Sequence, residues 1–194
     1  LNLIISGSVF TLMKRIFEDY KEPLFGRANC RMHIRPFSTS VLKQILSDHN
    51  PFYTGDDLLS LFSITGGIPW YVALLMDKGH TTKDRMLGYL TEENSPFIHE
   101  GKNILIEEFG PDYGMYFSIL TCIAGGMRTR GEIEGELQES NISSYLNRLE
   151  NYYGLIARSL PIFAKESSKK TRYMLSDCFL TLWFRFFYKY QSII

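Results

Sequence analysis

The hydrophobic pattern at the start of the chain predicts two short strands around a helix. Residues 1–5 form an apolar run rich in branched side chains, which ends at Ser6-Gly7-Ser8. This run predicts a buried parallel strand that leads into a helix over residues 9–20. Alternating polar and apolar residues over 31–35, closed by Pro36, predict a second strand. Because two strands and one helix cannot make a covered sheet, we expect the rest of the sheet to precede residue 1.

From residue 38 to residue 109 the apolar residues follow helical spacing. The predicted elements are a helix through Leu46 that Ser38 or Ser40 caps, a helix that opens at Asp56-Asp57, and helices over 70–76, 83–91 and 97–109. Between the second and third of these helices, Gly66-Gly67-Ile68-Pro69 predicts a tight turn. Pro69 suits the first turn of the next helix, where its missing N–H costs no hydrogen bond.

The dipeptide Gly110-Pro111 marks the clearest boundary in the chain. Three short helical patterns follow it: one over Tyr116–Ile123, one capped by Thr129, and one that starts near Ser140-Asn141 and ends at Gly154. The segments 155–163 and 171–175 predict two strands joined by a polar turn. Three helices followed by a hairpin have the order of a winged helix-turn-helix. Residues 178–190 are apolar on all sides and predict a last helix whose surface must be buried against other parts of the protein. If no other domain buries this helix, we expect a dimer contact there.

Composition narrows the class of protein. The 194 residues are 45% apolar and 22% charged, which is typical of a globular protein and excludes a disordered or collagen-like chain. Twenty-one basic and 21 acidic residues balance, so net charge indicates neither nucleic acid nor an acidic membrane as partner.

Three widely spaced cysteines favour a reducing cytoplasm over a disulfide framework. No apolar run approaches the roughly 20 residues that span a bilayer, so we expect no membrane partner. The chain starts with Leu inside a predicted strand, from which we expect a fragment.

Several short motifs occur in a defined order along the chain. They are Ile5-Ser6-Gly7-Ser8, Pro23-Leu24-Phe25-Gly26-Arg27, Arg35-Pro36-Phe37-Ser38, Gly66-Gly67-Ile68-Pro69, Gly154-Leu155-Ile156 and Tyr173-Met174-Leu175-Ser176-Asp177 with Trp183-Phe184-Arg185-Phe186. In this order the chain resembles the archaeal-type ATPases of the AAA+/STAND group of P-loop proteins. The resemblance implies a mainly α fold in four parts: the C-terminal end of an ATPase core with short strands (1–37), a helical lid (38–110), an α+β winged helix (111–177), and the start of a C-terminal module (178–194).

The resemblance also implies roles for single residues. Ser6 or Ser8 resembles the polar sensor that positions water against the γ-phosphate, and Arg27 resembles the arginine finger. Gly66, Gly67 and Pro69 resemble the lid motif that contacts the nucleotide. Each has a simpler interpretation: a helix-capping turn for the serines, a surface arginine beside Gly26, and a plain turn before a helix.

The chain departs from the family where phosphate and metal would bind. It has no Gly-x-x-x-x-Gly-Lys-Ser/Thr motif and no strand that ends in an acidic pair for magnesium. Cys30 and His33 have no partners at zinc spacing, so no metal site is predicted. We therefore expect ATP or ADP with Mg²⁺ only in an intact parent protein. The chain alone should bind no nucleotide tightly and hydrolyse no ATP, and its partners should be the missing core and C-terminal domain.

The winged-helix pattern leaves two functions open. Asn147 and Arg148 on its third helix could read bases, and Lys169, Lys170 and Arg172 on the hairpin could contact phosphates. Against this, the second helix carries four glutamates, Glu132, Glu134, Glu136 and Glu139, which repel a duplex. We prefer a packing module between the ATPase and the C-terminal domain, with at most weak DNA binding. The alternative is a winged-helix DNA-binding regulator with a helical partner-binding domain.

Overall fold

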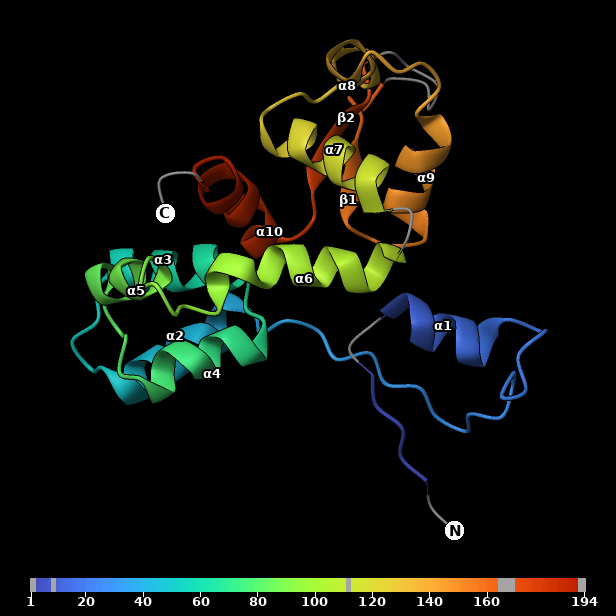
Figure 1. Ribbon diagram of the computed structural model, residues 1–194. Helices are drawn as coiled ribbons and strands as arrows, with labels where there is room; N and C mark the ends of the chain where they lie inside the picture. Colours follow the sequence, from blue (N-terminus) through green and yellow to red (C-terminus); the bar gives the residue numbers. More distant parts are fainter. Residues whose placement is uncertain (1–2, 8–9, 111–112, 164–169, 192–194) are drawn as a thin grey trace.

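The computed structural model describes residues 3–7, 10–110, 113–163 and 170–191. It is mainly helical, and β1 and β2 form the one sheet within those ranges. Three parts are visible in Figure 1: an N-terminal segment (residues 3–37) beside the body, a helical unit (α2 to α6), and a helix–hairpin unit (α7 to α9 with β1 and β2). The C-terminal helix α10 lies between the two units. In the described residues, none of the helices has the length and apolar character needed to cross a membrane.

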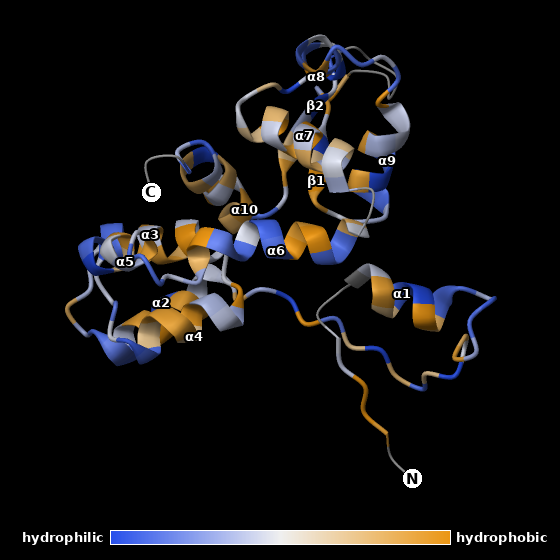
Figure 2. Cartoon of the chain, in the orientation of Figure 1, coloured by the Kyte–Doolittle hydropathy of each residue, from blue (hydrophilic) through white to orange (hydrophobic). Residues whose placement is uncertain are grey.

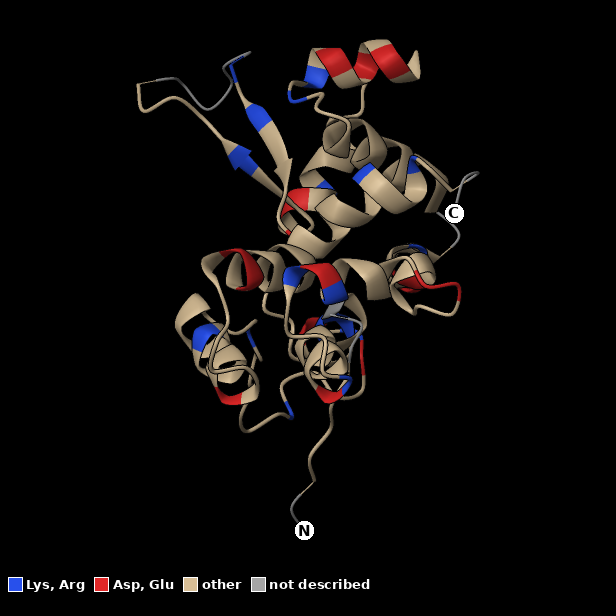
Figure 3. Ribbon diagram, turned by 90° about the vertical axis from the view of Figure 1, so that its left-hand side faces the viewer, with Lys and Arg blue, Asp and Glu red and all other residues tan. Residues whose placement is uncertain are grey.

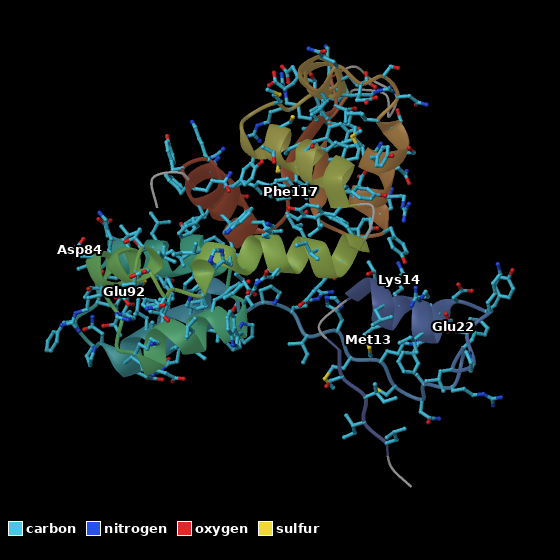
Figure 4. The ribbon with its side chains drawn as sticks, in the orientation of Figure 1. Met13, Lys14, Glu22, Asp84, Glu92 and Phe117 are labelled. Atoms are coloured by element: carbon cyan, nitrogen blue, oxygen red, sulfur yellow. The ribbon has the colours of Figure 1, made fainter. Side chains whose placement is uncertain are left out.

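The N-terminal segment contains the helix α1 (Phe10–Glu18), as its periodicity predicted. Thr11 on α1 donates a hydrogen bond of 2.7 Å to Glu108 on α6, which joins this segment to the body. Figure 4 shows Met13 and Lys14 on the same helix.

Neither strand predicted in the N-terminal segment forms. Residues 3–7 and 31–35 run as extended chain outside the sheet (Figure 1), and their apolar side chains face solvent, with Ile4 93% and Met32 84% exposed. Figure 2 shows the apolar stretch near the N-terminus standing away from the body. The prediction of a buried strand over 1–5 is therefore wrong for its described residues, because a strand needs a neighbour and the described chain offers none.

The helical unit has the five helices that the sequence predicted. Their bounds are α2 (Thr39–His49), α3 (Gly55–Thr65), α4 (Pro69–Asp77), α5 (Lys83–Leu90) and α6 (Phe97–Phe109). Ser38 caps α2 by accepting the Val41 N–H, and Pro69 occupies the first turn of α4, as expected. The second helix starts one residue before Asp56-Asp57, because Thr54 is its cap.

Asp57 ties the start of α3 to the start of α5. Its buried carboxylate accepts hydrogen bonds from the Thr54 N–H (2.7 Å) and hydroxyl (2.8 Å), and from the Lys83 N–H (2.6 Å). Burial alone would raise the pKa of Asp57, but the hydrogen bonds from Thr54 and Lys83 outweigh it and lower the pKa below its ordinary value. The ionised carboxylate therefore stabilises the fold.

We expect Asp57→Asn to lower the free energy of unfolding by about 1–2 kcal/mol at neutral pH, because an amide cannot accept all three hydrogen bonds. Since the pKa of Asp57 is lower in the folded chain than in the unfolded one, its contribution is present above about pH 4 and is lost as the pH falls through the folded pKa. Urea denaturation of both proteins from pH 7 downward should show the gap closing at acid pH. A gap independent of pH would contradict this role.

The helix–hairpin unit has the predicted order of elements. It consists of α7 (Tyr113–Ala124), α8 (Arg130–Leu137), α9 (Ser143–Asn151), β1 (Ile156–Ser159) and β2 (Arg172–Leu175). The strands are antiparallel, with Ile156 opposite Leu175 and Ser159 opposite Arg172. The first strand is shorter than the predicted 155–163, since Leu160-Pro161 follows it and proline cannot donate to a ladder.

The C-terminal segment is α10 (Cys178–Leu182), which continues as a π-helix, η2 (Trp183–Tyr188). Its apolar side chains are buried within this chain: Phe179 lies 4.6 Å from Tyr71 and Trp183 donates its indole N–H to the Ile98 carbonyl at 2.8 Å. Phe117 of α7, labelled in Figure 4, packs on Phe184 at 5.1 Å. The expected dimer contact through this helix therefore loses its basis, although Phe186 stays 57% exposed.

Candidate functional site

The Gly66-Gly67-Ile68-Pro69 turn joins α3 to α4 and is fixed by hydrogen bonds within the chain. Gly66 has a left-handed conformation (φ 57°) and caps α3 by donating to the Phe62 carbonyl at 2.8 Å. Thr65, fully buried, donates to the Leu61 carbonyl and accepts the Gly67 N–H at 3.1 Å. The turn is therefore held by hydrogen bonds from the chain's own residues.

Gly67 is covered by the segment that enters α2. The Phe37 N–H donates to the Gly67 carbonyl at 2.7 Å, and a Cβ on Gly67 would overlap the Phe37 backbone. Gly67 also has φ 80°, which side chains rarely adopt. This glycine therefore permits a close approach of the chain's own backbone.

The accessible part of the turn is its proline and the next residue. Pro69 is half-buried, and Trp70 is 52% exposed. Together they offer an apolar face at the start of α4, while Gly67 is buried beneath Phe37. Any ligand of this turn would meet Pro69 and Trp70 and would not meet Gly67.

The other residues that the resemblance singles out lie in the N-terminal segment. Ser6 is exposed in the extended stretch 3–7, and Ser8 lies outside the described residues. Arg27 is exposed and follows Gly26, which has φ 67°, and its N–H donates to the Leu24 carbonyl at 3.1 Å. Within the described ranges, neither Ser6 nor Arg27 has a hydrogen bond or ion pair with the Gly66–Pro69 turn.

The third helix of the helix–hairpin unit holds Arg148 against aromatic rings. Its guanidinium lies 5.7 Å from the ring centre of Tyr116 and 5.8 Å from those of Tyr152 and Tyr153, and it donates to the Tyr153 hydroxyl at 3.4 Å. These contacts stabilise the packing of α9 on α7. The neighbouring Asn147 is exposed.

The hairpin carries the cations expected there. Lys170 and Arg172 are exposed, and Lys169 lies outside the described residues. Arg158 of β1 forms an ion pair of 3.3 Å with Glu150 of α9. Figure 3 shows basic residues along both strands and acidic ones along α8. The cations and the acids of this unit thus lie on neighbouring elements.

The helix α8 carries three of the four predicted glutamates, since it ends at Leu137 before Glu139, and two of the three have structural roles. Hydrogen bonds from the Thr129 and Arg128 N–H groups lower the pKa of Glu132. Its carboxylate completes the capping box at the start of α8. The hydrogen bond from Arg130 at 2.7 Å lowers the pKa of Glu134, which also accepts the N–H groups of Asn141 and Ile142. Glu134 thereby fixes the turn before α9. This helix begins at Ser143, a few residues after the start predicted near Ser140-Asn141.

Comparison with known proteins gives little further information. No family model and no solved structure matches the chain. A protein of Methanocaldococcus jannaschii, described only as uncharacterized, is 29% identical over 197 residues, which cover 99% of this chain and 42% of that protein. The chain therefore spans less than half the length of this relative. Within the described residues, no group of three or more His, Cys, Asp or Glu side chains could hold a metal ion.

Proposed function

We propose that this chain is the lid and winged-helix part of an ATP-binding AAA+/STAND-like ATPase, which couples nucleotide state to a C-terminal module. The observation that carries this proposal is the N-terminal segment. Ile4, Met32 and Ile34 are 93%, 84% and 77% exposed in two extended stretches with the composition of strands. Such stretches suit a sheet supplied by an ATPase core outside this chain. The greater length of the archaeal relative is compatible with that arrangement.

The contact between Phe37 and Gly67 supports the coupling role. The segment that leaves the proposed core passes through Pro36 and is hydrogen-bonded to the Gly66–Pro69 turn before it enters α2. A displacement of the core would therefore act directly on the junction of α3 and α4. From there the helical unit reaches α10, which packs on α3.

The helix–hairpin unit would be the winged helix, in a packing role. The Tyr173 N–H donates to the Arg128 carbonyl at 2.7 Å. This backbone hydrogen bond attaches the loop between α7 and α8 to strand β2 of the hairpin. The stacking of Arg148 on three tyrosines and the pairing of Arg158 with Glu150 support packing over base reading. DNA binding by Asn147 and the hairpin cations remains the alternative function.

This chain does not supply the loop that cradles the phosphates of ATP or the ligands that hold its magnesium ion. The sequence contains no phosphate-binding loop, and the described residues hold no cluster of metal ligands. What the chain can contribute is the apolar face of Pro69 and Trp70 toward a base, and the Arg27 guanidinium toward charge on a phosphate.

The test is ATP turnover by a protein made from a longer reading frame that contains this chain. We expect turnover there and none from residues 1–194 alone. Arg27→Lys keeps the charge but loses the forked donors, so turnover should fall steeply while ATP binding persists. Arg31→Lys is the matched control, because Arg31 forms a surface ion pair with Glu18 at 3.0 Å. Full turnover of Arg27→Lys at saturating ATP would refute the finger assignment.

A further inference from the structure

A cavity of about 170 Å³ lies where the C-terminal end of α7 meets β2 and α10. The elements that line it are neighbours, since α7 and α10 both pack on β2 (Figure 1). Its lining combines apolar side chains of α7 and β2 with Thr181 and two arginines, Arg128 and Arg185. The arginines come from different elements, the loop before α8 and the π-helix η2. This cavity is separate from the Gly66–Pro69 turn and from the exposed face of α9.

The cavity carries positive charge without a matching carboxylate. Its described lining includes neither Asp nor Glu. Arg128 is half-buried and forms no ion pair with any described residue. The carboxylate of Glu132, four residues away, accepts the backbone N–H of Arg128 at 2.8 Å and does not pair with its guanidinium. A partly desolvated guanidinium with no counter-charge favours an anion from outside the chain.

Hydrogen bonds hold the main chain of Arg128 and the guanidinium of Arg185. The Arg128 carbonyl accepts the Tyr173 N–H, and the Arg128 N–H donates to Glu132, so its main chain is fixed on two sides. Arg185 donates its Nε–H to the Ala124 carbonyl at 3.1 Å. The C-terminal end of α7 carries a partial negative charge, which compensates part of the positive charge of Arg185. Arg128 therefore has the less compensated positive charge of the two arginines.

We propose that this cavity binds an oxyanion, the phosphate group of a phosphate monoester. Guanidinium groups donate two parallel hydrogen bonds to phosphate oxygens, which suits a dianion between two arginines. Since one water occupies about 30 Å³ in the liquid, the cavity has room for a phosphate group. The proposal concerns residues outside the proposed nucleotide contacts and does not depend on them.

An adjacent groove has room for the rest of such a ligand. It has a volume of about 470 Å³, shares Ala124 and Arg185 with the cavity, and is also lined by Phe186, Lys189 and Tyr190. Phe186 and Tyr190 are 57% and 42% exposed, so their rings can stack on a planar or apolar group. The phosphate could therefore belong to a nucleotide or to a monoester without a ring.

The experiment is an NMR titration of the whole chain with inorganic phosphate at constant ionic strength, observing the arginine Nε–H and backbone amide signals. We expect saturable shifts at Arg128, Arg185 and Ala124. Arg128→Ala should weaken binding by about tenfold or more, corresponding to about 1.4 kcal/mol, and Arg185→Ala by less. Arg85→Ala, at an exposed arginine of α5 outside the cavity lining, should leave binding unchanged.

Two further measurements keep the test decisive. Arg128→Lys keeps the positive charge but loses the two parallel donors of the guanidinium. Its affinity for phosphate should lie between those of the unsubstituted chain and Arg128→Ala, which separates the loss of recognition from a loss of folding. Titrations with AMP and with glycerol phosphate identify the source of the phosphate: tighter binding of AMP places a base in the groove, and equal binding limits recognition to the phosphate. Shifts that never saturate, or that Arg85→Ala reduces as much as Arg128→Ala, show attraction to surface cations only and overturn the proposal.

Discussion

Gly67→Ala should lower the free energy of unfolding by about 3 kcal/mol, which corresponds to a fall in Tm of roughly 6–12 °C for a chain of this size. Two costs combine at this position. The backbone φ of 80° strains any residue with a Cβ, and the new Cβ would overlap the Phe37 backbone. The contact is with main chain, which moves less easily than a side-chain tip. Differential scanning calorimetry measures the change.

Gly79→Ala is the matched control for Gly67→Ala. Gly79 has a similar φ of 71°, but a Cβ there would meet nothing within 4 Å. Its substitution should therefore cost only the backbone strain, about 1 kcal/mol. Equal losses of Tm in the two variants would mean that the close approach of Phe37 to Gly67 contributes nothing to stability.

Gly101→Ala should also destabilise the chain, by about 2 kcal/mol or roughly 4–8 °C in Tm, although alanine is the better helix former. Gly101 lies inside α6 under the indole of Trp183, and a Cβ would overlap that ring. Displacing the ring costs packing and endangers its 2.8 Å hydrogen bond to the Ile98 carbonyl.

The sign of the change separates this interpretation from helix propensity. Gly88→Ala in the neighbouring helix α5 places its Cβ in open space at an exposed position. That variant should gain about 0.5–1 kcal/mol. Thermal melts followed by circular dichroism should therefore show opposite shifts for the two variants. A rise in Tm for Gly101→Ala would mean that the Trp183 ring relaxes without cost.

Local sequence signals predicted the helices well. Ser38, Pro69 and Thr129 mark helix starts that the structure confirms, because capping and proline chemistry act within a few residues. Strand prediction failed over 3–5 and 31–35, since alternation of apolar residues indicates a face to be buried but supplies no neighbouring strand.

The candidate sites were harder to predict because their contacts join distant residues. Phe37 covers Gly67 from 30 positions earlier, and Arg128 shares a cavity with Arg185, 57 positions later. The spacing of residue types cannot reveal such neighbours. The helical pattern of α9 indicates Arg148 as a base reader, yet Tyr116 from another helix lies against it. By contrast, Asp56-Asp57 marks the start of α3 to within one residue from the local sequence, although the cap itself is Thr54.

The position of Phe179 has a consequence for how the chain is made. Its fully buried ring completes the core of the helical unit, at 4.6 Å from Tyr71 and 5.8 Å from Phe97. The ribosome adds Phe179 82 residues after Phe97, which takes roughly 4–16 s at 5–20 residues per second. During that interval α2 to α6 can form helices, but their shared core lacks a ring. Translation therefore delays the final packing of these early helices until α10 emerges.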